Sequence, residues 1–357
     1  MANEKKIFVG LSGGVDSSVA AFLLCKQGYA VTGVFIKVWQ PDFLTCTWQD
    51  DRQDAMRVCA HLGIPFKTLD LSDVYKKNVV DYMIAEYKKG HTPNPDVMCN
   101  RSVKFGAFLQ FAKEEGARAV ATGHYAQIKQ HENHATLWSS KDLKKDQTYF
   151  LWQLAQRDLS SVMFPIGHLR KEETRRIAAR AGLITATKRD SQGLCFLGKL
   201  DMKDFLRHFI KEKQGDVVLT TGEVVGKHRG VLFYTLGERH GFTLETKETR
   251  GPYYVVEKDN KRNRLIVDRE PLSPKAGKKL DLINVNWIGE PPKPEYLYRA
   301  RIRHGGALFP VTVGNNSSNG AHVTFSRTSP LTARGQSVVL YEEYKSGLRC
   351  IGGGFAQ

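Results

Sequence analysis

A glycine- and serine-rich stretch near the start of the chain has the composition of a binding site for an anion. Residues 10–18 read Gly-Leu-Ser-Gly-Gly-Val-Asp-Ser-Ser, between an apolar run at 7–11 that predicts a strand and an amphipathic run at 19–27 that predicts a helix. Glycine lets the backbone approach an anion closely, and the first amides of a helix have no acceptor within the helix. The stretch therefore predicts a cradle for phosphate groups.

Side chains of this cradle can add to the backbone amides. Ser12, Ser17 and Ser18 supply hydroxyl donors, and Asp16 could hold a magnesium ion against the same phosphates. The stretch lacks the Gly-Lys-Ser/Thr ending of a Walker A loop, so it has no lysine for γ-phosphoryl transfer. Ser-Gly-Gly-x-Asp-Ser-Ser instead resembles the PP-loop of the ATP pyrophosphatases, which hold the pyrophosphate of ATP and activate a substrate by adenylation.

Two of the six cysteines lie in segments that favour reactivity. Cys99 follows Asn94-Pro95-Asp96 in what we expect to be a loop between two helices, where nearby cations such as Lys104 and a helix N-terminus favour its thiolate. Cys195 lies between glycines on a segment that we expect to be flexible and accessible. Either cysteine alone could be an incidental thiol. Because 96 positions separate them, we expect their sulfurs to meet only if a loop moves.

The other cysteines have the surroundings of core residues. They form no Cys-x-x-Cys pair and no metal-finger spacing, and they lie in apolar settings, at Cys25, Cys46, Cys59 and Cys350. The N-terminus carries no signal-peptide core, and no apolar run is long enough to span a bilayer. We expect a cytoplasmic protein that has no membrane partner.

The charge is distributed unevenly along the 357 residues, whose formal net charge is +16. Residues 1–100 carry 11 basic and 11 acidic side chains, whereas 167–213 carry a net +6 and 293–357 a net +5. Lysine and arginine gain affinity for a phosphate backbone by releasing condensed counterions. A polyanion larger than ATP would suit this surface, although a generally basic surface is the plain alternative.

Alternating strands and helices in the first part predict an α/β fold with a doubly wound parallel sheet. The predicted strands are 7–11, 31–39, 66–71 and 117–122, and the predicted helices are 19–27, 50–62, 74–88 and 103–115. Ligands of such sheets bind outside the carboxyl ends of the strands. We therefore expect ATP to lie across residues 10–14, Ile36 and 122–124.

The chain length and the later patterns predict three domains. We expect a PP-loop catalytic domain at 1–213, whose residues 160–213 form a basic helical extension, a small central β-rich module at 214–273, and a C-terminal β-barrel at 274–357. The central strands are predicted at 216–219, 253–257 and 264–267, and those of the barrel at 280–287, 296–303, 309–313, 322–325, 337–341 and 347–352.

Three motifs together resemble those of the tRNA-specific 2-thiouridylases. They are Ser-Gly-Gly-Val-Asp-Ser-Ser at 12–18, Asn-Pro-Asp-x-x-Cys-Asn at 94–100, and Ser-x-Gly-x-Cys-Phe-x-Gly at 191–198. The resemblance is dense over the first 200 residues and includes 33–37, 121–125 and 145–151, and it is looser beyond, where 300–303 and 335–336 are its firmest points. Ile36 departs from the methionine of many members, and an apolar contact to adenine survives that change.

This resemblance implies an enzyme that replaces the 2-oxo group of the wobble uridine with sulfur in certain tRNAs, with glutamate, glutamine and lysine acceptors. ATP, with Mg²⁺, adenylates the oxygen, so that AMP becomes the leaving group. A cysteine desulfurase or a sulfur-relay protein loads Cys195 as a persulfide, whose terminal sulfur attacks the carbon or is released to attack it. Cys99 is then the second thiol, and a transient Cys99–Cys195 disulfide remains.

The same resemblance implies the remaining site residues. ATP would be bound by Gly10, Leu11, Ser12, Gly13, Gly14, Val15, Asp16, Ser17, Ile36 and Gly123. The extruded target base would face Asn94, Pro95 and Asp96, with Asp96 a candidate general base. The tRNA would contact His124, Lys145, Asp146, Gln147, Arg303, His304 and Gln336, although His124 could instead be a strand-end histidine whose partner is the backbone.

Two other functions are compatible with the loop. A synthetase that adenylates a carboxylate or carbonyl of a small molecule would explain ATP binding, but it leaves Cys99, Cys195 and the basic C-terminal half unexplained. A tRNA-binding scaffold with a vestigial ATP site would explain the charge, but the loop residues are intact from Ser12 to Ser17.

Overall fold

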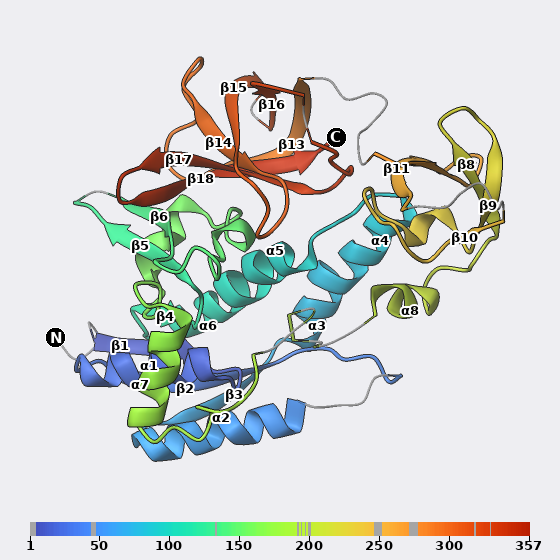
Figure 1. Cartoon of the computed structure of the whole chain (residues 1–357). Helices are drawn as coiled ribbons and strands as arrows, with labels where there is room; N and C mark the ends of the chain where they lie inside the picture. Colours follow the sequence, from blue (N-terminus) through green and yellow to red (C-terminus); the bar gives the residue numbers. More distant parts are fainter. Residues whose placement is uncertain are drawn as a thin grey trace.

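The computed structural model describes most of the chain, and three layers are visible in it (Figure 1). The described residues are 5–43, 48–132, 134–190, 193, 195–196, 198, 201–245, 252–270, 278–317, 319–328 and 330–357. Cys46 lies outside them. No helix in the described part of the chain is both long and apolar enough to cross a bilayer.

A parallel sheet forms the base of the molecule, as the strand-helix alternation predicted. Its order is β3-β2-β1-β4-β7, with the strands β1 (Lys6–Gly10), β2 (Ala30–Lys37), β3 (Phe66–Asp70), β4 (Ala119–Ala121) and β7 (Val162–Met163). The helices α1 (Val15–Lys26) and α2 (Trp48–Leu62) follow β1 and β2. The two-residue strand β7 was not predicted, because so short a run has no periodicity.

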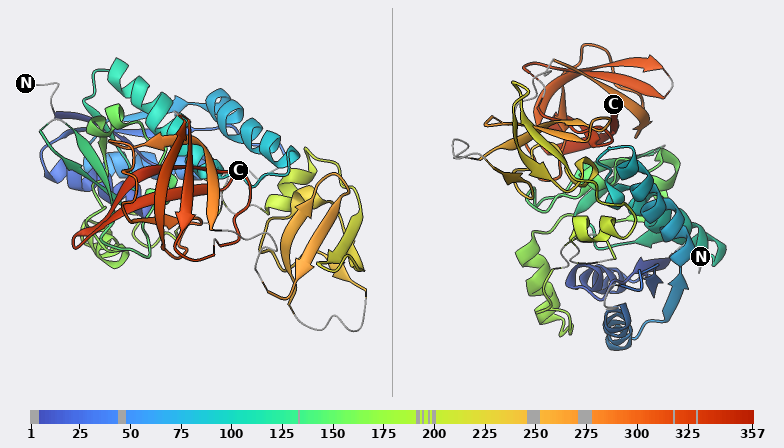
Figure 2. Two further views of the ribbon diagram at one scale, coloured as in Figure 1. Left: turned by 90° about the horizontal axis from the view of Figure 1, so that it is seen from above. Right: turned by 90° about the vertical axis from the view of Figure 1, so that its right-hand side faces the viewer.

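Two long helical stretches lie between this sheet and the C-terminal barrel (Figure 2). The first comprises α3 (Ser72–Tyr75), a π-helical segment (Lys76–Asp81) and α4 (Tyr82–Lys88). The second comprises α5 (Pro95–Cys99), a π-helical segment (Asn100–Ala107) and α6 (Phe108–Glu114). The prediction that a loop carries Cys99 was therefore wrong. Asn94 caps the helix by accepting hydrogen bonds from the amides of Asp96 and Val97, and Pro95 takes the first helical position, where its missing N–H costs nothing.

The basic extension contains short helices. α7 (Lys171–Arg180) packs against α1 through the buried side chains of Val15, Val19 and Ala178, and α8 (Met202–Arg207) precedes the central module. That module is a five-stranded sheet of order β10-β9-β8-β12-β11. Its strands are β8 (Gly215–Leu219), β9 (Val224–His228), β10 (Thr243–Leu244), β11 (Tyr254–Asp259) and β12 (Arg264–Asp268), of which β9 and β10 were not predicted.

The C-terminal strands close into a six-stranded barrel, because β13 pairs with both β16 and β18. The strands are β13 (Lys279–Trp287), β14 (Tyr298–Arg301), β15 (Phe309–Ser317), β16 (Gly320–Phe325), β17 (Ser337–Tyr344) and β18 (Gly347–Ala356). Two further strands, β5 (Ala126–Gln130) and β6 (Ala135–Ser139), extend this sheet through the β18–β6 pairing. Neither strand was predicted; β6 pairs with β18, more than 200 positions away, and β5 pairs with β6.

A segment after β6 attaches the barrel to the first domain. The Asp146 side chain is almost completely buried and accepts hydrogen bonds from the Ser140 amide (3.0 Å), the Thr148 hydroxyl (2.7 Å) and Arg301 of β14 (3.2 Å). The Tyr149 hydroxyl donates to the carbonyls of Ile302 (3.1 Å) and Ser337 (2.9 Å). Buried polar groups need such partners, so these bonds dictate how the barrel docks.

We expect Arg301→Met to destabilise this contact strongly. It leaves the buried Asp146 carboxyl without its cation, and the loss of one partner of a buried pair costs about 3 kcal/mol. Arg299→Met is the matched control on the same strand, because Arg299 pairs with the exposed Glu343 and its loss costs less than about 1 kcal/mol. Urea unfolding of the two variants measures the difference, and equal midpoints would contradict this role for Arg301.

Candidate nucleotide and thiol site

The PP-loop has the geometry of an anion cradle. Gly14 is the N-cap of α1 in an extended conformation, and the Ser17 hydroxyl accepts a hydrogen bond from the Ser12 amide (3.2 Å). Gly13 has a φ of +70°, and a Cβ atom there would lie 2.4 Å from the Asp51 carbonyl oxygen. No other residue fits that position without moving the backbone. The loop is therefore tightly folded against the N-terminus of α1.

Two further predicted ATP residues lie at neighbouring strand ends. Ile36 is buried near the end of β2, and Gly123 follows β4. A Cβ atom at Gly123 would lie 2.6 Å from the Ser17 amide nitrogen, so this glycine allows the two loops to touch. Leu11 and Val15 are buried and hold the loop against the sheet. The carboxyl ends of β1, β2 and β4 thus meet at one edge, as the fold class requires.

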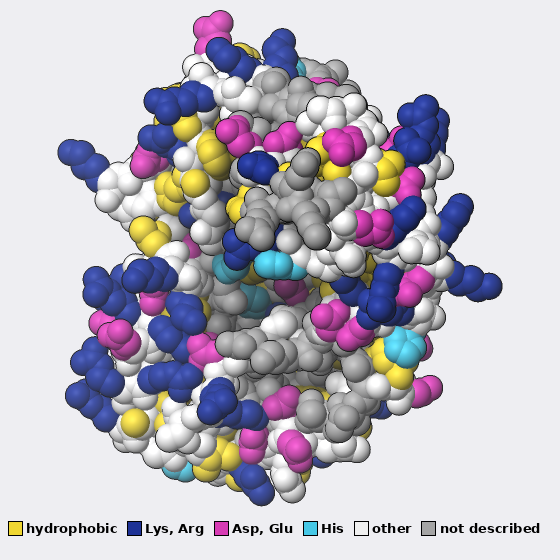
Figure 3. Space-filling model, turned by 45° about the vertical axis from the view of Figure 1, so that its right-hand side comes forward, with side chains coloured by type: hydrophobic (Ala, Val, Ile, Leu, Met, Phe, Trp, Pro, Cys, Tyr) yellow, Lys and Arg dark blue, Asp and Glu magenta, His cyan; other side chains and the backbone are white. Residues whose placement is uncertain are grey.

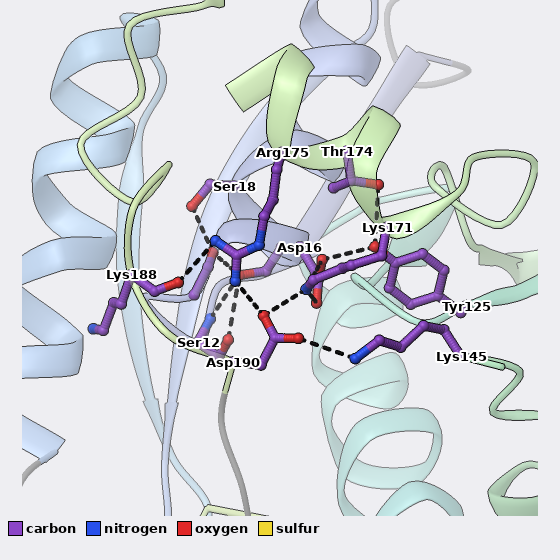
Figure 4. A network of polar contacts seen from close by, with 12 residues as sticks. Ser12, Asp16, Ser18, Tyr125, Lys145, Lys171, Thr174, Arg175, Lys188 and Asp190 are labelled. Carbon is purple, nitrogen blue, oxygen red and sulfur yellow. Dashed lines mark hydrogen bonds and ion pairs between the residues drawn. The ribbon is translucent and has the colours of Figure 1, made fainter. Parts of the chain in front are cut away.

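A network of ion pairs surrounds the mouth of the loop (Figure 4). Both carboxylate oxygens of Asp16 lie 2.8 Å from the Lys171 ammonium, and the Tyr125 hydroxyl donates to Asp16 at 3.0 Å. Lys171 also contacts Asp190 at 2.8 Å. As these side chains stand, both carboxylate oxygens of Asp16 already have hydrogen-bond partners. The sequence prediction that Asp16 holds magnesium stays a prediction.

The two sulfur atoms lie in contact. The Cys99 thiol, at the end of α5, donates to the Cys195 sulfur at 3.5 Å. The prediction that the two meet only after a loop moves was wrong, because helix α5 and the segment around Cys195 already pack together. Cys99 is completely buried, contrary to the prediction of an accessible loop thiol, whereas Cys195 is half-buried.

Three side chains hold the Cys195 backbone and its sulfur. The Asp96 carboxylate accepts the Cys195 amide (3.0 Å), and the Tyr75 hydroxyl donates to the Cys195 carbonyl (2.8 Å). The Lys104 ammonium lies beside both sulfurs and 5.4 Å from the centre of the Phe196 ring. Asp96 and Lys104 both lie on the helical stretch that carries Cys99, so one rigid element positions one thiol, a carboxylate and a cation.

The two thiols differ in acidity. The hydrogen bond from Cys99 and the Lys104 charge lower the pKa of Cys195 to about 7, although burial acts in the opposite direction. Burial and the neighbouring Cys195 sulfur raise the pKa of Cys99 well above its ordinary value. Burial also raises the pKa of the Asp96 carboxyl. Cys195 is therefore the thiolate of the pair near neutral pH, and Cys99 is the protonated donor.

Residues predicted to contact the base or the tRNA fall into two groups: some lie near Asp96, and the others are bonded within the protein. Asn94 and Pro95 shape the start of α5, beside Asp96. His304 comes from the loop after β14, its ring centre lies 4.4 Å from that of Phe150, and burial lowers its pKa below the ordinary value. His124 is buried, its Nδ1 lies 2.7 Å from the Thr122 hydroxyl, and burial lowers its pKa well below the ordinary value.

The other predicted tRNA contacts take part in internal bonds. Lys145 pairs with Asp190, Asp146 is buried against Arg301, and Gln147 accepts the Tyr125 amide. Arg303 donates to the Leu236 carbonyl of the central module (3.1 Å), and Gln336 accepts the Ala333 amide (3.3 Å). Their contacts with tRNA stay predictions. For Asp146 the structure adds a role in docking the barrel.

Four residues of the site were not predicted from the sequence: Tyr75, Lys171, Arg175 and Asp190. Tyr75 lies in an apolar helical pattern, and the others lie in a charged stretch that could equally be a solvated surface.

The molecular surface is hollowed in the middle of the face in Figure 3, and histidine side chains lie at the edge of this hollow. Lys and Arg side chains gather on the same face, at the lower left, over the part of the molecule that holds α7.

Comparisons with known proteins agree with this architecture. Residues 5–199 match the family model described as tRNA methyl transferase HUP domain, 203–269 match tRNA methyl transferase PRC-barrel domain, and 277–356 match Aminomethyltransferase beta-barrel domain. The tRNA-specific 2-thiouridylase MnmA 2 of Geobacillus kaustophilus is 44% identical over 360 residues, which cover 99% of this chain and 94% of that protein. The tRNA-specific 2-thiouridylase MnmA of Alkaliphilus oremlandii is 43% identical, over 98% of this chain and 96% of its own length.

A more distant relative gives the same result. The tRNA-specific 2-thiouridylase MnmA of Christiangramia forsetii is 41% identical over 386 residues, which cover 95% of this chain and 97% of that protein. The likeness therefore spans the parallel sheet with its PP-loop, the sulfur pair and both β-rich parts. On this evidence the chain belongs to the family of tRNA-specific 2-thiouridylases.

Proposed function

We propose that this chain uses ATP to replace the 2-oxo group of the wobble uridine of tRNA with sulfur. The observation that supports this most directly is the pair of sulfur atoms, 3.5 Å apart and next to Lys104, in the domain that also carries the PP-loop. A small-molecule synthetase has no use for two thiols in contact. The proposed substrates are ATP, which enters with Mg²⁺, and tRNAs with glutamate, glutamine or lysine acceptors.

The first step activates the oxygen. The uracil O2 attacks the α-phosphorus of ATP, an O–P bond forms, and pyrophosphate leaves. The open amides at the N-terminus of α1 and the hydroxyls of Ser12 and Ser17 bind the phosphates. Asp96, whose pKa is raised by burial, is the candidate general base for the proton on uracil N3.

The second step brings sulfur. The Cys195 thiolate attacks the outer sulfur of a persulfide carried by a desulfurase or a relay protein, and the donor leaves as a thiolate. The terminal sulfur of the Cys195 persulfide then attacks uracil C2, and the C–O bond to AMP breaks. Cys99 attacks the Cys195 sulfur, the S–S bond of the persulfide breaks, and the terminal sulfur stays on C2. A Cys99–Cys195 disulfide results, and an external thiol reductant restores both cysteines. The 3.5 Å separation supports this exchange.

The tRNA surface is proposed to run from α7 to the barrel. α7 carries Arg170, Arg176 and Arg180 in or beside it, and the barrel contributes Arg303 and His304. A cytoplasmic location, where tRNA and a reducing thiol pool occur together, belongs to this proposal.

We expect both cysteines to be required for product. Purified protein is incubated with ATP, magnesium, a persulfide-generating desulfurase and unmodified tRNA, and thiolated uridine is detected by retarded migration in mercury-containing gels. Cys195→Ser and Cys99→Ser should lower product by about 10³-fold or more, because each removes a residue that bonds covalently to sulfur in the reaction. Cys25→Ser is the matched control, and ATP binding should persist in all three. Full turnover by either active-site variant would rule out its role.

We expect Lys104 to set the reactivity of Cys195. Alkylation of Cys195 by iodoacetamide, followed by mass spectrometry, should rise with pH through about 7, since the thiolate reacts and its pKa is lowered to that value. Lys104→Met should move this midpoint upward by about one unit or more, because the thiolate loses its cation. Lys113→Met, an exposed lysine of α6 paired with Asp158, should leave the midpoint unchanged. An unshifted midpoint in Lys104→Met would remove Lys104 from the mechanism.

We expect tRNA binding to depend strongly on salt. Affinity should fall by about 10²-fold between roughly 50 and 200 mM salt, the change for about four phosphate contacts. ATP affinity should fall much less, since a small anion displaces few counterions. Filter binding for tRNA and calorimetry for ATP measure both, and a tRNA affinity as insensitive as that for ATP would contradict a basic tRNA surface.

A further inference from the structure

Two cations of α7 face the PP-loop from a distant part of the sequence. Lys171 and Arg175 are four positions apart, so they lie on one face of the helix. The Lys171 side chain is only 12% exposed, although it carries a charge. Lys171 is 155 positions along the chain from Asp16, and its ammonium contacts both oxygens of the Asp16 carboxylate. Because burying an ammonium group costs free energy, a largely buried lysine at this place points to a specific role beside the loop.

Asp190 occupies the centre of a cationic cluster. One of its oxygens contacts Lys171 at 2.8 Å and Arg175 at 2.5 Å, and the other contacts Lys145 at 3.1 Å (Figure 4). Burial opposes the charge of Asp190, but Lys171 and then Lys145 outweigh it and lower its pKa to about 2. Three cations thus converge on one carboxylate beside a loop built for phosphates.

This cluster supplies the positive charge that the PP-loop lacks. The PP-loop has no lysine of its own, and a triphosphate carries more negative charge than the hydroxyls and amides of the loop neutralise. Lys171 joins Asp16 of the loop to Asp190, so its ammonium is at the mouth of the cradle. Phosphate oxygens offer the same hydrogen-bond geometry to a lysine and an arginine as the Asp190 carboxylate does, with more charge.

We propose that Lys171, together with Arg175, binds the pyrophosphate half of ATP, and that Asp190 is the counterion which those phosphates replace. The inference rests on the proposed function, whose ATP-dependent step it deepens. Lys171 then neutralises the charge that develops on the leaving pyrophosphate, in the place of the lysine that other phosphate-binding loops carry within the loop.

Calorimetry without tRNA tests this separately from thiolation. Lys171→Met should weaken binding of ATP and of inorganic pyrophosphate about 10- to 100-fold, the loss for a charged hydrogen bond, while AMP binding stays unchanged. Lys171→Arg should restore part of the loss. Lys26→Met is the control, because Lys26 is an exposed cation in the last turn of α1, at the end of that helix opposite the PP-loop, and this variant should bind all three ligands like the parent.

Asp190→Asn separates a counterion from a structural residue. If Asp190 competes with phosphate, its removal should tighten pyrophosphate binding several-fold, because Lys171, Arg175 and Lys145 lose their competitor. Unchanged pyrophosphate affinity in Lys171→Met, or weakened affinity in Asp190→Asn with AMP affinity intact, would overturn the proposal. Absence of thiolation by a parent protein that binds pyrophosphate through Lys171 would instead count against the proposed function.

Discussion

A negatively charged sulfur inside a protein needs a cation and a hydrogen-bond donor beside it, and this requirement organises the centre of the molecule. Lys104 supplies the charge and the Cys99 thiol supplies the hydrogen bond, so Cys195 is acidic while Cys99 is not. Both partners lie on the helical stretch that starts at Pro95, and Asp96 of the same stretch holds the Cys195 amide. A single helix thus orders the sulfur pair, and its N-cap at Asn94 positions that helix.

The surrounding parts attach to this helix layer from both sides. The segment from Asp146 to Trp152 docks the barrel through buried bonds, among them Trp152 to the Ser337 hydroxyl at 3.1 Å, and so brings His304 towards Asp96. On the other side α7 packs on α1 and carries Lys171 and Arg175 to the PP-loop. The nucleotide end and the sulfur end of the site are therefore built by elements that lie far apart in sequence and share one set of packed helices.

Much of this could be predicted from local pattern. The strand-loop-helix order around Gly13, the parallel sheet and the β-rich C-terminal part all follow from periodicity and from glycine placement, which act over a few residues. The helix that carries Cys99 was missed although Asn-Pro-Asp is a capping pattern, because the proline was interpreted as a loop signal. β6 was not predicted because its burial depends on a partner strand in the barrel, β18, and β5 was not predicted because its only partner is β6.

The amino-acid sequence alone indicated the chemical groups available: a phosphate cradle without a lysine, two candidate thiols and a basic surface. These depend on residue type and on spacing within one element. The folded arrangement was needed to show which thiol is the more acidic, that the two sulfurs are in contact, and that Lys171 reaches Asp16. The physical reason is that acidity and contact depend on burial and on neighbouring charges, and these come from chain segments about 100 to 150 positions apart, which no local pattern relates.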